Sequence, residues 1–247
     1  MLEPNLTYPP LNRLKPVADN IWIADGPVIQ FSAWWLKIPF STRMTVIRLQ
    51  SSGLFIHSPI GLTPSLKTEI EALGEPRWIV APNRLHHWWL PEWHGALGEA
   101  QIFVASKVRE QAGDRIRFEC RELDRESGFP WDGEIATLPI TGSYMTEVAF
   151  FHQATRTLVL TDLIENFEAH KISSRLIRFL IWAGGVQDPD GSTPRDIRAT
   201  FAKKPEAVTA VRRMIEWNPE RVIIAHGRWY ERDGQAELSR AFRWLLG

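Results

Sequence analysis

Four short apolar runs in this chain each lead to side chains that can bind a metal ion. The runs have the length and composition of buried strands, and they cover residues 54–56, 77–80, 158–161 and 222–225. The potential ligands that follow them are His57, the pair His86 and His87, Asp162 and His226. Ligands bind at the carboxyl ends of strands in open α/β sheets, because these ends meet at one edge. The pattern therefore predicts a fold that gathers imidazole and carboxylate groups into a metal site.

The order of the other patterns predicts two sheets packed together with helices outside. The predicted strands cover residues 20–25, 28–38, 44–49, 54–57, 77–81, 101–105, 133–139, 147–152, 157–161 and 221–225. The predicted helices begin near residues 64, 106, 172, 194, 205 and 235, and another short helix ends near residue 97. The strands over residues 44–49 and 54–57 are expected to form a hairpin whose turn contains Gly53. Thr63 is a good N-cap for the first of the predicted helices, and Gly184-Gly185 would end the helix that begins near residue 172. Strands and helices do not alternate as in βαβ units, so the expected fold class is α+β.

The length of 247 residues suits one large domain or two small ones, and no low-complexity linker or charge block separates two halves. Residues 1–17 contain four prolines and little pattern, so they are expected to form an N-terminal arm. Residues 18–247 are then a single domain. The region 113–134 is polar and irregular, and it gives no clear element.

The composition limits the partners and the compartment. Lys+Arg and Asp+Glu are equal at 29 each, which gives no electrostatic reason to expect nucleic acid or an anionic membrane as a partner. No apolar run approaches the roughly 20 residues needed to span a bilayer. The single cysteine, Cys120, rules out a disulfide within the chain, and no partner for it is visible. The N-terminus lacks the pattern of a secretory signal, so a cytoplasmic protein is expected.

Each candidate ligand has a simpler structural interpretation when it is taken alone. A histidine pair such as His86-His87 more often marks a helix start with one ring packed and one exposed. Asp162 is a good N-cap because its carboxylate accepts hydrogen bonds from backbone amides. His226 is followed by Gly227, which allows close approach of another group. Taken together, however, one carboxylate and three imidazoles at strand ends form a set acceptable to zinc or ferrous iron.

Twelve tryptophans are many for this length, and three of them lie beside the histidine pair: Trp88, Trp89 and Trp93. Tryptophan brings a large buried area, so core packing is the first interpretation. An aromatic wall around a pocket is the alternative, and the sequence does not separate the two.

The order of elements and these strand ends resemble the metallo-β-lactamase fold superfamily. That resemblance implies a four-layer αββα sandwich, a His-x-His-x-Asp-His motif after an early βα unit, a later Gly-His, a strand-end Asp or Cys, and a His-Gly near the C-terminus. In this chain the corresponding places hold Asn83-Arg84-Leu85-His86-His87, Gly142-Ser143, Asp162 and His226-Gly227. The combination of Asn-x-x-His-His with a later Ala-His-Gly resembles a divergent branch catalogued only as a domain of unknown function.

The resemblance implies the loss of one ion of a two-metal site. The places that would bind the first ion read Asn83 or Arg84, Leu85 and Ser143. The places for the second ion map onto His86, His87, Asp162 and His226, once the motif is shortened by one residue. The side chains expected to support these ligands are His57, Asn83 and Ser143. Substitute ligands for a second ion would be His57, Glu147 and His94.

Two functions are therefore compatible with the sequence. In the first, His86, His87, Asp162 and His226 bind one divalent metal, with zinc favoured over iron or manganese, and an open position on the ion permits hydrolysis of an unknown small molecule. In the second, the chain is a relic of the fold that is metal-free or holds a purely structural metal, and it acts as a binding or scaffold module. The sequence leaves enzymatic activity, substrate and oligomeric state open.

Overall fold

The computed structural model describes residues 6–33, 36–201 and 204–247, in which two β-sheets pack face to face. The first sheet has the order β1 (Lys15–Ala18), β2 (Ile21–Ala33), β3 (Leu36–Arg48), β4 (Gly53–His57), β5 (Glu75–Ala81), β6 (Gln101–Val104), β7 (Arg121–Glu122). The second sheet has the order β11 (Arg221–Ile223), β10 (Thr157–Val159), β9 (Thr146–His152), β8 (Ile135–Thr141). Strands β4 to β7 are parallel, as are β10 and β11, while the other pairs are antiparallel.

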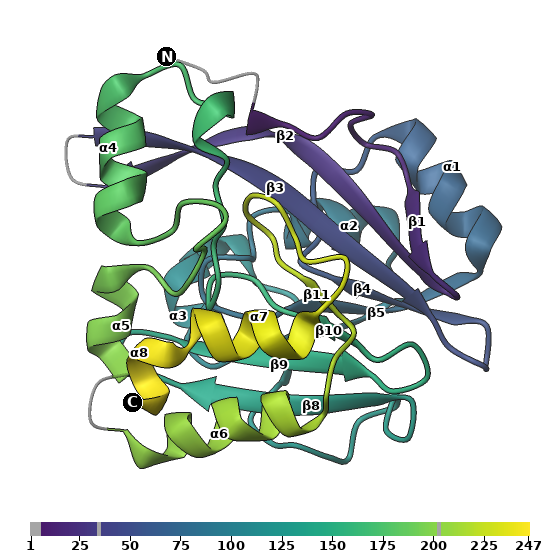
Figure 1. The fold of residues 1–247 in the computed structure, drawn as a ribbon. Coiled ribbons are helices and arrows are strands. Elements are labelled where there is room, and N and C mark those ends of the chain that lie inside the picture. Colours follow the sequence, from purple (N-terminus) through teal and green to yellow (C-terminus); the bar gives the residue numbers. More distant parts are fainter. Residues whose placement is uncertain (1–5, 34–35, 202–203) are drawn as a thin grey trace.

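Helices cover the outer faces of the two sheets (Figure 1). Their bounds are α1 (Pro64–Leu73), α2 (Leu90–Ala96), α3 (Val108–Ala112), α4 (Arg175–Gly184), α5 (Arg195–Phe201), α6 (Pro205–Glu216), α7 (Gly234–Ala241) and α8 (Arg243–Leu246). Helices α6 and α7 lie over the second sheet, α1 packs beside β5, and α4 stands near the far end of the β2–β3 hairpin. Short 3₁₀ turns at Gly113–Arg115 and Ala169–Lys171 complete the described elements. The predicted α+β sandwich is confirmed at the level of layers.

Local sequence signals set several of these boundaries. Thr63 accepts a hydrogen bond from the Leu66 amide at the start of α1, where Pro64 is the first helical residue. Ser174 caps α4 in the same way, and Gly185 ends that helix with φ of 74° in the left-handed region. The predicted hairpin of β3 and β4 is present, with Thr45 opposite His57. These predictions of caps and hairpin are confirmed.

One prediction of an element is wrong, and one segment holds more structure than expected. The strand expected over residues 28–38 is instead the end of β2 and the start of β3, with residues 34–35 outside the described part of the chain. β2 continues beyond residue 25, where the sequence predicted its end. A bulge between Gly26 and Ile29 shifts the register and lets the pairing with β3 continue. The expected N-terminal arm also contains structure, since β1 pairs with β2 and Leu6 is buried. The first five residues of that arm lie outside the described ranges.

The largest core fills the space between the two sheets and centres on Trp131. This side chain comes from the region that looked irregular in sequence, and it is 1% exposed. Its ring lies 4.7 Å from that of Phe103, 4.9 Å from that of Phe55 and 5.0 Å from that of Phe129. Its indole N–H donates to the Thr137 hydroxyl at 2.9 Å, so the buried polar atom is satisfied.

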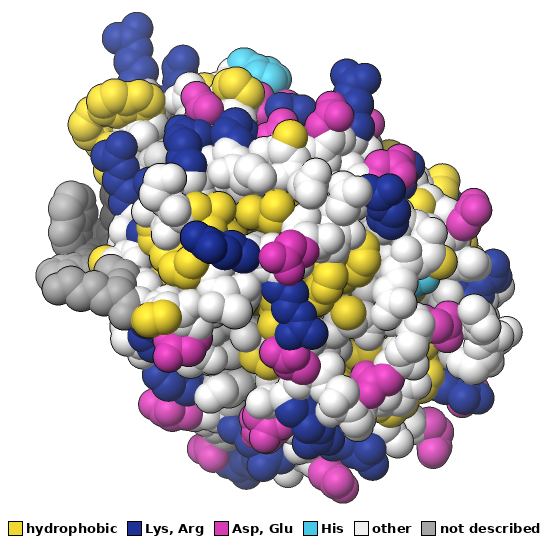
Figure 2. Space-filling view, turned by 60° about the horizontal axis from the view of Figure 1, so that its bottom comes forward, with side chains coloured by type: hydrophobic (Ala, Val, Ile, Leu, Met, Phe, Trp, Pro, Cys, Tyr) yellow, Lys and Arg dark blue, Asp and Glu magenta, His cyan; other side chains and the backbone are white. Residues whose placement is uncertain are grey.

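The surface shows no concentration of one charge on the side that Figure 2 presents, where acidic and basic side chains of the described residues are interspersed. Among the described residues, none of the helices has both the length and the apolar character needed to cross a membrane.

We expect Trp131→Ala to lower the free energy of unfolding by about 3–5 kcal/mol, because it opens a cavity between the sheets. Trp182→Ala is the matched control, since that indole is 63% exposed on α4, and it should change stability by less than about 1 kcal/mol. Urea denaturation followed by circular dichroism measures both. Equal losses for the two variants would show that Trp131 does not anchor the core.

Candidate metal centre

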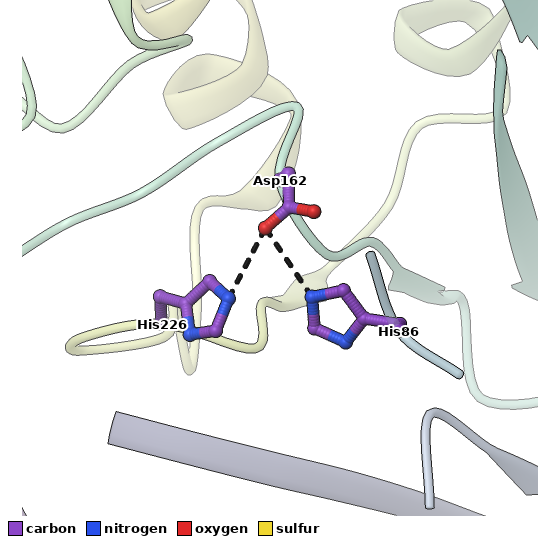
Figure 3. Close-up of side chains that lie close together, drawn as sticks. All are labelled: His86, Asp162 and His226. Carbon is purple, nitrogen blue, oxygen red and sulfur yellow. Dashed lines mark hydrogen bonds and ion pairs between the residues drawn. The ribbon is translucent and has the colours of Figure 1, made fainter. Parts of the chain in front are cut away.

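Three of the four strand ends converge on one point. His86 lies in the loop after β5, Asp162 follows β10, and His226 follows β11. Each offers one ligand atom, and these atoms lie within 4.8 Å of one another. Oδ1 of Asp162 stands between the two rings, 3.3 Å from Nε2 of His86 and 3.1 Å from Nε2 of His226 (Figure 3). We call these three residues the triad.

The hydrogen bond at the back of His226 determines which nitrogen carries its proton. Nδ1 of His226 lies 2.6 Å from the carbonyl oxygen of Ser41. A carbonyl only accepts, so Nδ1 carries the hydrogen, and in the neutral ring Nε2 is a lone-pair acceptor. That lone pair then faces the Asp162 carboxylate, which is also an acceptor. Two buried acceptors at 3.1 Å require a proton or a cation at the triad.

Asp162 is fixed from behind by two buried polar side chains. Asn83 donates its amide hydrogen to Oδ2 of Asp162 at 2.7 Å, and its own carbonyl oxygen accepts from the amides of Leu85 and His86. Glu147, on β9, accepts from the backbone amides of residues 161, 162 and 163 at 2.7–3.1 Å. These bonds hold the turn after β10 so that the free oxygen Oδ1 points to the two imidazoles.

The loop that carries His226 is tied to the first sheet. Arg43, on β3, donates to the carbonyl oxygens of Ile224 at 2.7 Å and Gly227 at 3.0 Å. Its guanidinium is 1% exposed and forms an ion pair of 2.7 Å with Asp25. Gly227 has φ of 86°, and a Cβ there would stand 2.1 Å from the carbonyl oxygen of Asn166, so only glycine fits.

The other side chains predicted for the site lie elsewhere. His87 is not part of the triad: its Nδ1 lies 2.9 Å from the carbonyl oxygen of Arg84, and its ring stacks on Trp88. The two adjacent side chains diverge in the turn after β5, so only His86 reaches Asp162. Ser143 is exposed and hydrogen-bonds the carbonyl oxygen of Thr200 rather than any triad residue.

His57 is fully buried, and its ring lies edge-on to Phe150. Its Nε2 has no hydrogen-bond partner among the described residues. Burial, with a smaller contribution from the charge of His86, lowers the pKa of His57 to about 3. Of the three predicted supporting residues, only Asn83 therefore contacts the triad directly.

Two of the proposed substitute ligands are also engaged elsewhere. The carboxylate of Glu147 is occupied by backbone amides and by the Asn83 amide, and the ring of His94 stacks on Phe118 with centroids 4.2 Å apart. The group of three donors is the one cluster of its kind found in the described part of the chain.

The charges of the triad act against burial. Burial alone would raise the pKa of Asp162, but the neighbouring imidazoles of His86 and His226 outweigh it and hold that pKa below its ordinary value. Glu165 lies three residues after Asp162, and it lines the cavity into which the triad opens. Burial raises its pKa well above the ordinary value, and the charges of Asp162, Asp196 and Glu147 act in the same direction. The two carboxyl groups therefore have pKa values shifted in opposite directions.

Sequence patterns gave partial signals for the supporting roles that were missed. Glu147, considered only as a substitute ligand, is an acid at the start of the otherwise apolar run 147–151, which is a signal for a buried polar role. Arg43 and Glu165 carry no comparable local signal, because their importance depends on what the other sheet brings near them. The tryptophans divide between the two interpretations. Trp93 is buried and donates to the carbonyl oxygen of Ile60, while Trp88 and Trp89 line the cavity beside the triad.

The spacing of Asp162 from each imidazole suits a tetrahedral metal ion. Two ligands bound at about 2.0–2.1 Å in a tetrahedron stand about 3.3 Å apart, which matches the spacing of Asp162 from each imidazole. Two imidazole nitrogens and one carboxylate oxygen leave a fourth position for another ligand. The residues present therefore suit a divalent ion such as zinc.

Comparison with known proteins is consistent with this architecture. The model of a family described as a domain of unknown function (DUF4336) matches residues 19–174, which is more than half of the chain. No match to a curated protein was found.

Solved structures similar over nearly the whole chain include metallo-β-lactamases. One from Pontibacter korlensis is 12% identical with a TM-score of 0.60, and the match covers 94% of this chain and 97% of that one. FIM-1 from Pseudomonas aeruginosa, in its mono-zinc form, is 11% identical with a TM-score of 0.60 and coverage of 94% and 95%. One from Hirschia baltica is 11% identical with a TM-score of 0.58 and coverage of 92% and 95%. The metallo-β-lactamase fold predicted by resemblance is thus confirmed.

The buried imidazole of His57 should make the protein sensitive to acid. Its folded pKa lies below its unfolded value of about 6.5, so the unfolded state binds more protons and stability falls as pH drops through that window. Between about pH 7 and pH 5 this group alone should cost about 2 kcal/mol. Urea unfolding at the two pH values should show that His57→Leu removes this loss. His170→Leu, at an exposed histidine, is the control and should keep the wild-type dependence. If His57→Leu loses as much as wild type, the ring is not held neutral.

Proposed function

We propose that the triad binds one divalent metal ion and that the site hydrolyses a small molecule. The chain belongs to the family described as a domain of unknown function (DUF4336). The observation that carries the proposal is the facing of two acceptors, Asp162 Oδ1 and His226 Nε2, at 3.1 Å with the ring proton committed to Ser41. A buried arrangement of this kind is stable only with a cation or a proton between the two acceptors.

Zinc is the favoured ion, with iron and manganese as alternatives. Imidazole nitrogens with one carboxylate oxygen are a common zinc set, and three protein ligands leave the open position typical of catalytic sites. FIM-1 has been solved in a mono-zinc form, which supports a one-ion site within this fold. When bound, such an ion lowers the pKa of water and polarises a carbonyl or phosphoryl oxygen.

The protein residues would have separate roles in hydrolysis. Asn83 and Glu147 orient Asp162, and the Ser41 carbonyl orients His226, as supporting hydrogen bonds do for metal ligands. Ser58 lies 2.6 Å from Nδ1 of His86 and fixes the angle of that ring. Glu165 lines the cavity, and its raised pKa suits it to hold a proton and give that proton to a leaving group.

The alternative function is a binding or scaffold module without a catalytic ion. Two observations favour it. Leu85 and Ser143 stand where ligands of a first metal ion would be expected, and His87 lies outside the triad. In that case one imidazole of the triad carries a second proton and forms an ion pair with Asp162. The two functions differ in metal content, which is directly measurable.

Protein purified without a histidine tag should contain about one divalent ion per chain by elemental analysis. His226→Ala removes a ligand and should weaken metal retention at least as much as the roughly 10–100-fold typical of losing a supporting hydrogen bond. His87→Ala is the matched control, because that ring faces Arg84 and Trp88, and it should retain the ion. Circular dichroism confirms that both variants fold. Metal content far below one ion, unchanged in His226→Ala, supports the scaffold module instead.

A second experiment tests hydrolysis. Screening carboxylic esters, lactones and phosphoesters should reveal activity that a chelator abolishes and zinc restores. Glu165→Gln should then lower kcat by about 10²–10⁴-fold with metal content unchanged, since it removes a proton donor. The acid form is present below the raised pKa and is lost above it, so the alkaline limb of the pH profile should disappear in this variant. Glu206→Gln, at an exposed position on α6, is the control. An unchanged alkaline limb in Glu165→Gln excludes this role.

A further inference from the structure

The cavity that contains the triad has walls that are mostly apolar. Its volume is about 600 Å³, within the range of roughly 300–1,000 Å³ that is usual for small-molecule sites. Apolar side chains come from several elements, including Phe40, Trp89, Phe167, Ile177, Leu180 and Ile181. Such walls favour hydrocarbon, because burying it removes apolar surface from water on both partners.

The helix α4 forms one of these walls with a defined face. Ile177 and Ile181 stand one helical turn apart, are less than 10% exposed, and line the cavity together with Leu180. Leu176 and Phe179 lie on the opposite side of the same helix, where they are 55% and 57% exposed. The inner face of α4 therefore packs in a small apolar cluster with Leu6, Phe167 and Val186, and it also lines the cavity.

Polar groups of the cavity are concentrated at the triad. His86, Asp162 and His226 line it together with the carboxyl group of Glu165. Arg43 also lines the cavity, but its guanidinium is committed to Asp25 and to two backbone carbonyls. The remaining charged lining residues are Arg195 and Asp196, which are neighbours of opposite sign. A ligand that fits has one polar group at the triad and a long apolar part.

We propose that the cavity binds the hydrocarbon chain of an acyl compound, with its ester group at the triad. The identity of the reacting end rests on the proposed function, whereas the binding of the chain does not. In the reaction, water adds its oxygen to the carbonyl carbon, the bond to the alcohol oxygen breaks, and the alcohol leaves with a proton. The products are a carboxylic acid and an alcohol.

Displacement of a fluorescent fatty acid by saturated carboxylates from butanoate to tetradecanoate tests the chain site without requiring activity. Each methylene should tighten binding about fourfold, the equivalent of about 0.8 kcal/mol, until the cavity is filled. Ile181→Trp narrows the cavity and should weaken the longest chains at least tenfold while leaving the shortest unchanged. Leu180→Trp, at a half-buried position of the same wall, gives a second variant in case the first does not fold. Leu176→Trp on the outer face is the matched control and should bind all chains as wild type does.

The same titration on metal-free, chelator-treated protein separates this inference from the proposed function. If the protein never binds metal but affinity still rises with chain length, the chain site is supported and the proposed hydrolase is contradicted. Stoichiometric metal with affinities that do not rise with chain length overturns the chain site and leaves the hydrolase intact. Long-chain binding that is equally strong in Ile181→Trp, Leu180→Trp and Leu176→Trp also overturns it, because the chain then lies elsewhere.

Discussion

The site depends on one buried carboxylate that is not itself a member of the triad. Glu147 gathers three successive backbone amides of the turn after β10 and also accepts from Asn83, which belongs to the loop after β5. One side chain on β9 thus joins the ends of strands from both sheets. Burial and the nearby Asp162 carboxylate raise the pKa of Glu147, and the amide hydrogen bonds act against that rise. Without these bonds, neither Asp162 nor His86 would be held in place.

The hydrogen bonds around Asp162 leave more acceptors than donors at the triad. Asn83 uses its amide hydrogens on Asp162, Glu147 and Thr161, and the Nδ1 proton of His226 is used on Ser41. The oxygen Oδ1 of Asp162 is left facing two ring nitrogens with no donor supplied by the backbone. The fold therefore builds an anionic position that a cation or a proton must complete, and Arg43 anchors it by tying β3 to the loop of His226.

Sequence patterns predict the parts of this structure that are determined locally. The N-cap at Thr63, the β3–β4 hairpin and the strand-end positions of His86, Asp162 and His226 follow from residue types within a few positions of each. The choice between His86 and His87 does not, because it depends on the rotation of a single turn. Trp131 and Arg43 were also missed, since the first lies in a region without periodicity and the second acts on carbonyl groups 181 and 184 residues away.

The apolar cavity and the charged triad reinforce each other physically. Attraction between Asp162 and a cation at the triad is stronger where water is excluded, and hydrocarbon in the cavity would exclude more of it. The same loss of water would raise the pKa of Glu165 further, because burial and the charge of Asp162 already act in that direction. A chain lying against Ile177 and Ile181 would thus strengthen the cation site and keep the neighbouring carboxyl group protonated. Binding of the proposed apolar ligand and the state of the polar groups would then be coupled through the exclusion of water.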